Sequence, residues 1–227
     1  MAQGFNPTGA VGGGIGEAFI PDQGLYPGPV RKVAILGHSF VRYLPVTREI
    51  YRPFFQFTAL ACPGATVESL PLTQEWSRLS VLKPSLTFII IGGNDIKPGI
   101  EPKDLAHKIE DLAQRVKEIT GGEVKIFGIE KRVGPRGLTA DRFNQLRNAV
   151  NRWLKRHIIF TRDRYLSMDT NHTSFARDGV HLNIPASDAL FKKIHDVSVE
   201  FFASDEQALN DRWYELFCAA GWMNPDQ

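Results

Sequence analysis

The chain is poor in cysteine, in net charge and in long apolar runs, and each shortage excludes a class of protein. Its two cysteines, Cys62 and Cys218, are too few for a disulfide framework or for a tetrahedral metal site built from cysteine alone. No window approaches the roughly 18 apolar residues of a membrane span, and no basic segment followed by an apolar stretch suggests a secretory signal. We therefore expect an intracellular, cytoplasmic protein from a reducing compartment.

The charge is nearly balanced, with 27 Lys and Arg against 25 Asp and Glu and a formal net charge of +2. This excess is too small to indicate nucleic-acid binding, although a local basic patch would leave that partner open. With 227 residues, 43% of them hydrophobic, the chain can bury one sizeable core. We expect one domain with appendages.

Three regions differ in composition. Residues 1–29 are rich in Gly and Pro and are predicted to form a flexible arm. Residues 30–203 carry the domain. Residues 204–227 are expected to form a helix and tail packed on the domain, because Ser204 and Gln207 resemble a capping box ahead of an apolar stripe. The alternative is a helix that contacts a partner or a membrane surface.

Short apolar runs alternate with helical patterns from residue 30 onward. Buried parallel strands are predicted at 33–36, 54–60, 86–91 and 124–129, with a weaker fifth candidate at 157–161. Helices are predicted at 101–119, 139–156 and 185–202. This alternation predicts a doubly wound α/β sheet, in which ligands bind at the carboxyl ends of the strands.

Two motifs follow predicted strands directly. Ser39, in Gly37-His38-Ser39, lies where a strand turns into a helix, so it is either an exposed nucleophile or a helix cap. Asn94, in Gly92-Gly93-Asn94-Asp95, carries a neutral amide that can donate to an oxyanion, although Asn-Asp is also ordinary turn chemistry.

A third motif, Asp178-Gly179-Val180-His181, precedes the last core helix. The glycine allows the segment to fold back, so the carboxylate can hold one imidazole nitrogen while the other faces a serine. A capping Asp178 and a surface His181 are the alternative.

Together with Gly64, these motifs resemble the Ser-Gly-Asn-His hydrolases, also called the GDSL esterase and lipase superfamily, over roughly residues 33–182. The resemblance implies a three-layer α/β/α fold with a flavodoxin-like, parallel five-stranded sheet. It implies that Ser39 is the nucleophile, His181 the general base and Asp178 the residue that orients the imidazole. The oxyanion hole would consist of the backbone N–H groups of Ser39 and Gly64 with the Asn94 side chain. No metal or cofactor is implied.

One residue departs from this family. His38 stands where the family usually has Asp, and we expect it to pack or tune the loop and not to replace His181. The motif wording also resembles animal members associated with LINE-type retrotransposon first-frame proteins, in which an esterase domain follows a disordered or coiled-coil region.

The resemblance implies a small-molecule ester or lipid substrate: a short acyl or acetyl ester, a lipid or an acetylated sugar. A binding or assembly module that retains the fold without catalysis is the alternative. No pattern indicates an oligomeric state.

Other polar residues have weaker claims. Cys62 is expected to be a small buried residue rather than a second nucleophile. Asp169 and His172 are candidates for the rim of the site. Lys131, Arg132 and Arg136 either contact an anionic substrate or form a solvated loop. The remaining histidines lack metal-ligand spacing and are expected in surface or cap roles: His107, His157 and His195.

Overall fold

The computed structural model describes residues 30–46, 55–135, 137–162, 164–168 and 170–219; the side chains of Arg162, His172 and residues 204–219 are not part of the description. The predicted arm at 1–29 lies outside these residues. In chain order the elements are β1 (Arg31–Gly37), η1 (Ser39–Tyr43), β2 (Phe55–Ala61), η3 (Leu70–Leu72), α1 (Gln74–Leu82), β3 (Leu86–Ile90), α2 (Pro102–Thr120), β4 (Glu123–Phe127), α3 (Ala140–Arg156), α4 (Ile159–Arg162), β5 (Tyr165–Leu166), η4 (His172–Ser174) and α5 (Ile184–Ala219).

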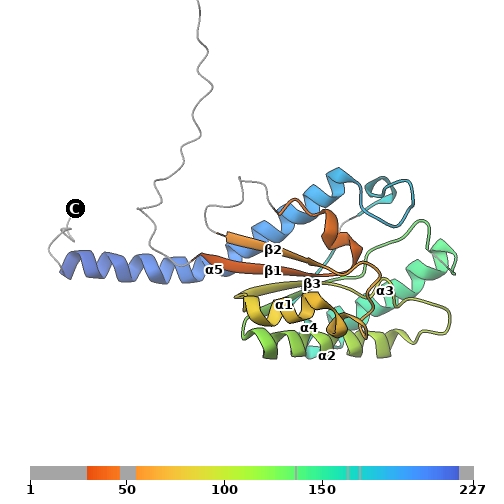
Figure 1. Cartoon of the computed structure of the whole chain (residues 1–227), viewed down its shortest axis with the longest axis horizontal. Helices are drawn as coiled ribbons and strands as arrows, with labels where there is room; N and C mark the ends of the chain where they lie inside the picture. The colour runs from red at the N-terminus through yellow and green to blue at the C-terminus, as the bar shows by residue number, and fades with distance from the viewer. Residues whose placement is uncertain (1–29, 47–54, 136, 163, 169, 220–227) are drawn as a thin grey trace, which may run out of the picture.

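The five strands form one sheet in the order β2-β1-β3-β4-β5, and every pairing is parallel. Helices α1, α2 and α3 cover one face, and α5 covers the other (Figure 1). This confirms the predicted three-layer, five-stranded architecture. In this flavodoxin-like order the connections reverse direction between β1 and β3, where such folds bind their ligands.

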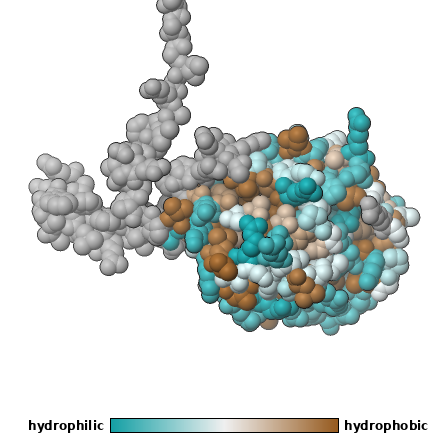
Figure 2. Space-filling view, in the orientation of Figure 1, coloured by the Kyte–Doolittle hydropathy of each residue, from teal (hydrophilic) through white to brown (hydrophobic). Residues whose placement is uncertain are grey.

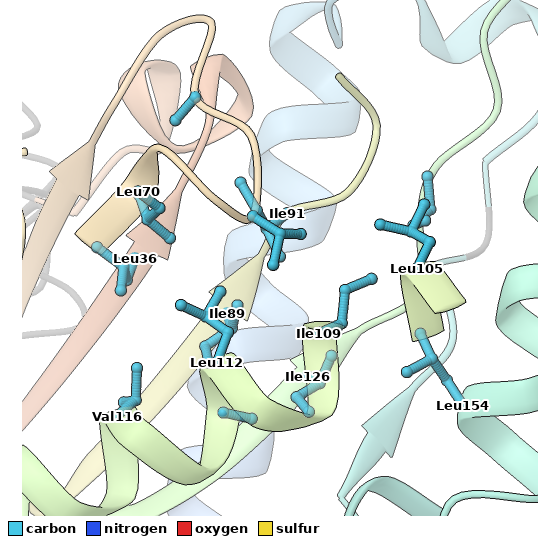
Figure 3. Packing of buried hydrophobic residues seen from close by; sticks show 14 of the residues in the cluster. Leu36, Leu70, Ile89, Ile91, Leu105, Ile109, Leu112, Val116, Ile126 and Leu154 are labelled. Carbon is cyan, nitrogen blue, oxygen red and sulfur yellow. The ribbon is translucent and has the colours of Figure 1, made fainter. Parts of the chain in front are cut away.

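Strand β1 is central because both of its faces are buried. Ala34 and Leu36 pack toward α2, whereas Val33 and Ile35 pack toward α5. Alternating side chains point to opposite faces, so a continuous apolar run can serve both layers. Figure 3 shows the first of these cores, in which side chains from β1, β3 and β4 meet those of α2 and α3. The two cores hold the carboxyl ends of β1 and β3 side by side.

The prediction of a strand at residues 157–161 is wrong. The chain instead turns after α3 and forms the short helix α4. The Ile158 N–H donates to the Trp153 carbonyl at 3.2 Å, and the Thr161 hydroxyl donates to the Leu154 carbonyl at 2.8 Å. The fifth strand is β5, a two-residue strand that begins after α4. Its apolar signal was too short to be recognised from sequence.

The final helix is longer than predicted. Residues 185–202 and the segment from Ser204 onward form one 36-residue helix, α5, because no Gly or Pro separates them. The helix starts beside the carboxyl ends of the strands and continues past their amino ends (Figure 1). Phe202 still contacts the sheet, with the Arg31 guanidinium 5.3 Å from its ring centre. Packing of the segment after Ala203 stays a prediction.

The surface shows mixed hydropathy. Leu72 and Val81 are exposed hydrophobic residues, 86% and 82% accessible. On the face shown in Figure 2, hydrophobic residues are interspersed with hydrophilic ones. Within the described segments, no helix combines the length and the apolar composition needed to cross a membrane.

Candidate functional site

Ser39 and Asn94 follow the two strands that flank the reversal point of the sheet. Ser39 starts η1 just after β1, and Asn94 lies in the turn after β3. A hydrogen bond from the His38 N–H to the Ile90 carbonyl, 3.1 Å long, continues the β1–β3 pairing up to the residue before the serine. The expected ligand position of this fold and the predicted nucleophile therefore coincide.

The structure brings Ser39, His181 and Asp178 into one hydrogen-bonded chain. His181 Nε2 lies 2.9 Å from Ser39 Oγ, and His181 Nδ1 lies 2.5 Å from Asp178 Oδ2. Because a carboxylate can only accept, Nδ1 carries the proton and Nε2 is free to accept from the serine hydroxyl. This is the geometry in which an imidazole can remove a serine proton.

The Asp178–His181 segment folds by local rules. Asp178 Oδ1 accepts hydrogen bonds from the backbone N–H groups of Val180 and His181, at 2.9 and 3.0 Å. Gly179 has a φ of +63°, which residues with a side chain rarely adopt. The Gly179 carbonyl accepts from the Val133 N–H at 2.7 Å, which ties this turn to the loop after β4. Asp178 therefore caps its own turn and holds the imidazole at once, while its catalytic role stays a prediction.

Asp178 is a carboxylate over the whole neutral range. Its hydrogen bond to the His181 ring and the two backbone N–H groups lower the pKa of Asp178 from 3.8 to about 2. The side chains of Asp178 and His181 are 49% and 35% exposed, so this half of the site is open to water. A stable anion beside Nδ1 favours the imidazolium that forms when Nε2 takes a proton.

His38 is adjacent to Ser39 but has a different environment. It is 3% exposed, its Nδ1 accepts from the Phe40 N–H at 3.4 Å, and its ring packs edge-on against Phe40. Burial, and then the nearby charges of Arg132 and His181, lower the pKa of His38 from 6.5 to about 3. The ring is therefore neutral, and the prediction that His38 packs the loop is confirmed.

The loops that carry Gly64 and Asn94 are joined by side-chain hydrogen bonds. Asn94 Nδ2 donates to the Ala65 carbonyl at 2.9 Å. One residue further on, both Asp95 carboxylate oxygens accept from the Val67 N–H, at 3.1 and 3.2 Å. The predicted oxyanion donors Gly64 and Asn94 thus come from two loops held in a fixed relation to each other.

Sequence reasoning missed the contact between Arg132 and Asn94. Arg132 Nη2 donates to Asn94 Oδ1 at 2.8 Å, and the guanidinium lies over the Phe143 ring at 5.3 Å. Of the three basic residues in question, Lys131 is exposed, Arg132 is half-buried and Arg136 lies outside the described residues. The one available signal was the position of Arg132 just after the fourth strand, at the site edge of the sheet.

Cys62 lines a hollow of about 410 Å³ together with Gly64 and Glu75. Its Sγ lies 3.5 Å from Thr73 Oγ1, and burial raises the pKa of the thiol. A protonated thiol is a weak nucleophile, which agrees with the expected role as a small buried residue. Neither Ser39 nor Asn94 lines this hollow.

The remaining candidates make no contact with Ser39, His181 or Asp178 among the interactions described, or their side chains are not described. His107 pairs with Glu110 at 3.4 Å on α2, His157 ends α3, and His195 packs against Phe55. Asp169 is not described, and neither is the side chain of His172. Among the described residues, no three His, Cys, Asp or Glu side chains gather as metal ligands would.

Comparison with known proteins adds a family and a fold. The pattern of the GDSL-like Lipase/Acylhydrolase family matches residues 28–188. A carbohydrate acetylesterase from Sinorhizobium meliloti is 15% identical, with a TM-score of 0.60 over 76% of this chain and 100% of that one. A carbohydrate esterase of family 3 from Talaromyces cellulolyticus is 12% identical, with a TM-score of 0.54 over 77% of this chain and 99% of that one.

A lipase/acylhydrolase from Enterococcus faecalis is 16% identical, with a TM-score of 0.51 over 77% of this chain and 96% of that one. No curated protein matches the sequence. At these identities the structural matches show the fold alone. None of the matches named here concerns a retroelement, so that resemblance stays a prediction.

Proposed function

Because the chain belongs to the GDSL-like lipase/acylhydrolase family, we propose that it is a serine esterase that cleaves a carboxylic ester through an acyl-Ser39 intermediate. The observation that carries this proposal is the hydrogen-bonded chain from Ser39 Oγ through His181 to Asp178. A binding module would gain nothing from a serine hydroxyl aligned with an imidazole and a carboxylate.

In the acylation step, Ser39 Oγ attacks the ester carbonyl carbon while its proton passes to His181 Nε2. A tetrahedral intermediate forms, and its oxygen carries the negative charge. As this intermediate collapses, the bond to the alcohol oxygen breaks, and His181 returns the proton to the leaving alcohol. Asp178 remains ionised and stabilises the imidazolium in between.

In the deacylation step, water replaces the alcohol. His181 Nε2 removes a proton from water, the resulting hydroxide attacks the acyl carbon, and Ser39 Oγ leaves with the proton from His181. The side chain of His181 is 35% exposed, so water can approach the ring. The products are a carboxylic acid and the free enzyme, and no cofactor enters either step.

The negative charge of the intermediate needs hydrogen-bond donors. The backbone N–H groups of Ser39 and Gly64 and Asn94 Nδ2 are the proposed set. One Nδ2 hydrogen is bound to the Ala65 carbonyl, which leaves the second for the substrate oxygen. Fixed donors of this kind stabilise the transition state more than the ground state.

The substrate class in the proposal is a small-molecule ester or lipid. Acetyl esters are the first probes to try, because a similar structure is that of a carbohydrate acetylesterase. Longer acyl chains and acetylated sugars complete the panel. A cytoplasmic location and a place in a retroelement protein rest on the sequence alone and belong to this proposal.

Hydrolysis of p-nitrophenyl acetate, butyrate and octanoate by the wild type, Ser39→Ala and Ser77→Ala tests the proposal. Ser77 is exposed on α1 and serves as the matched control. We expect loss of turnover only in Ser39→Ala, by about 10³-fold or more. Equal rates in wild type and Ser39→Ala, or no turnover in either, would contradict the proposal and favour a binding module.

Labelling with a fluorophosphonate separates activation of the nucleophile from choice of substrate. An activated Ser39 forms an Oγ–P bond and expels fluoride, which mass spectrometry detects as an adduct on the peptide that contains Ser39. The expected result is an adduct on wild type and none on Ser39→Ala. An unlabelled wild type would count against an activated serine whatever the ester panel showed.

A further inference from the structure

Arg132 is anchored at both ends next to the proposed oxyanion hole. Its backbone is held by Asn144, which accepts from the Arg132 N–H at 3.4 Å and donates to the Arg132 carbonyl at 3.3 Å. Its guanidinium rests over Phe143 and reaches Asn94. Within the described part of the chain, Arg132 forms no ion pair with a carboxylate. A half-buried cation placed this way has the Asn94 amide as its polar partner.

The Asn94 amide has one orientation that satisfies both neighbours. Its oxygen faces the Arg132 donor, and its nitrogen faces the Ala65 acceptor. After a flip, the amide nitrogen would face the guanidinium, and the amide oxygen would face the Ala65 carbonyl. Both hydrogen bonds would be replaced by repulsion between like groups. The observed orientation therefore leaves the second Nδ2 hydrogen as the donor that Asn94 can offer to a substrate oxygen.

We infer that Arg132 is a positioning residue for ester hydrolysis: it locks the Asn94 amide with Nδ2 toward the reacting oxygen and polarises that amide through Oδ1. A cation beside the amide oxygen draws electron density from nitrogen, which makes the remaining N–H a stronger donor. This inference rests on the proposed esterase function, because an oriented donor matters when an oxyanion forms.

The surroundings of Arg132 are shaped to admit the guanidinium. A Cβ atom on Gly93 would lie 2.9 Å from Arg132 Nη2 and 3.4 Å from His38 Nε2, so the glycine leaves room for both side chains. His38 is neutral there, since burial and the charge of Arg132 lower the pKa of His38 to about 3. The guanidinium therefore has an uncharged ring across Gly93, not a second cation.

A double-mutant cycle tests whether Arg132 acts through Asn94. The variants are Arg132→Met, Arg132→Lys, Asn94→Ala and the double variant R132M/N94A, with Arg142→Met as control because Arg142 is exposed on α3. Arg132→Met should lower kcat about 10- to 100-fold with less change in KM, as displacement of a reacting group does. Arg132→Lys should recover part of that loss, and Arg142→Met should show none.

In the Asn94→Ala background, Arg132→Met should change kcat by less than about twofold, because the group it positions is gone. Equal losses of kcat in both backgrounds, or a loss carried by KM alone, would overturn the inference and assign Arg132 to direct substrate contact. Failure of the proposed esterase function itself would look different: the wild type would then show no Ser39-dependent turnover.

Two further measurements test the inference if Arg132→Met does not fold or if turnover cannot be used. If Arg132→Met does not fold, Gly93→Ala and G93A/N94A repeat the cycle, since the added methyl displaces the guanidinium without removing it. The side-chain amide resonances of Asn94, assigned by their loss in Asn94→Ala, provide a readout that does not need turnover. Arg132→Met should shift them and speed their hydrogen exchange; unchanged resonances would contradict the lock.

Discussion

The two sides of the site are held together by different means. On one side, Asp178 and His181 lie in a single short turn that is open to water, and the hydrogen bonds that hold the Asp178 side chain all come from this turn. On the other side, Asn94 is held by Ala65 and Arg132, which come from two separate loops. One side is local and exposed, and the other is assembled from distant segments.

The difference follows from what each side must do. Under the proposed esterase function, His181 is the general base and exchanges protons with substrate and water in every cycle, so its partial exposure is compatible with that task. An oxyanion donor works by being fixed before charge develops, and fixed dipoles are strongest where water is excluded. His38 illustrates the contrast, because it is adjacent to Ser39 but belongs to the buried side and is neutral there.

Replacement of His181, the proposed general base, should have the largest effect on activity. For His181→Ala we expect kcat to fall about 10³-fold or more, because the proton of Ser39 has no acceptor. The side chain is partly exposed, so the free energy of unfolding should change by no more than about 1 kcal/mol. Steady-state kinetics and urea unfolding measure the two quantities, with His107→Ala on α2 as control. Retention of a tenth of the activity would show that another group is the base.

Removal of Asn94, the proposed oxyanion donor, should have the next largest effect on kcat. Asn94→Ala should lower kcat about 10²- to 10³-fold with a small change in KM, because the amide acts on the transition state. It also leaves the Arg132 guanidinium without its acceptor, so stability should fall more than in His181→Ala. A variant that loses stability but keeps full kcat would place the oxyanion elsewhere.

Asp178→Asn should lower kcat by less than His181→Ala does, because water can reach the partly exposed imidazole and replace part of the lost interaction. It should also change acid stability. The folded pKa of about 2 lies below the ordinary 3.8, so the stabilisation from Asp178 is complete above pH 4 and is lost as the pH falls toward 2. Between pH 5 and 2, the free energy of unfolding measured with urea should fall more steeply for the wild type than for Asp178→Asn. An equal fall in both proteins would contradict a stabilisation that comes from the ionised Asp178.

His38→Gln should have the smallest effect on kcat and a clear effect on stability. The unfolded chain protonates His38 near pH 6.5, whereas the folded protein resists protonation until about pH 3. Between these values the wild type therefore loses stability as the pH falls, by at most about 1.4 kcal/mol per pH unit from this residue. The difference in unfolding free energy between wild type and His38→Gln should shrink across this window. A constant difference would mean that His38 is not buried as a neutral ring.

Local features were the predictable ones. The Asp178 turn could be recognised from sequence because a carboxylate, a glycine and a histidine within four residues contain all the groups that form it. The strands β1 to β4 could be recognised because their apolar runs are long enough to signal burial. Strand β5 and helix α4 could not, since their assignment depends on packing against α3 and β4.

The contact of Arg132 with Asn94, in contrast, could not be predicted from the sequence. Thirty-eight positions separate the two residues, and nothing in the local pattern distinguishes Arg132 from its exposed neighbour Lys131. The two residues differ because Asn144 and Phe143 of α3 contact Arg132, whereas Lys131 is exposed to water.

By itself the sequence determined the layered α/β fold, the order of the motifs and the turn that joins Asp178 to His181, because apolar periodicity and short-range hydrogen bonds are properties of neighbouring residues. The tertiary structure alone decided that His181 reaches Ser39 across 142 positions, that Arg132 donates a hydrogen bond to Asn94 and that His38 is neutral. Those outcomes depend on distance, burial and the direction of single hydrogen bonds, which exist once the parallel strands bring their carboxyl ends together.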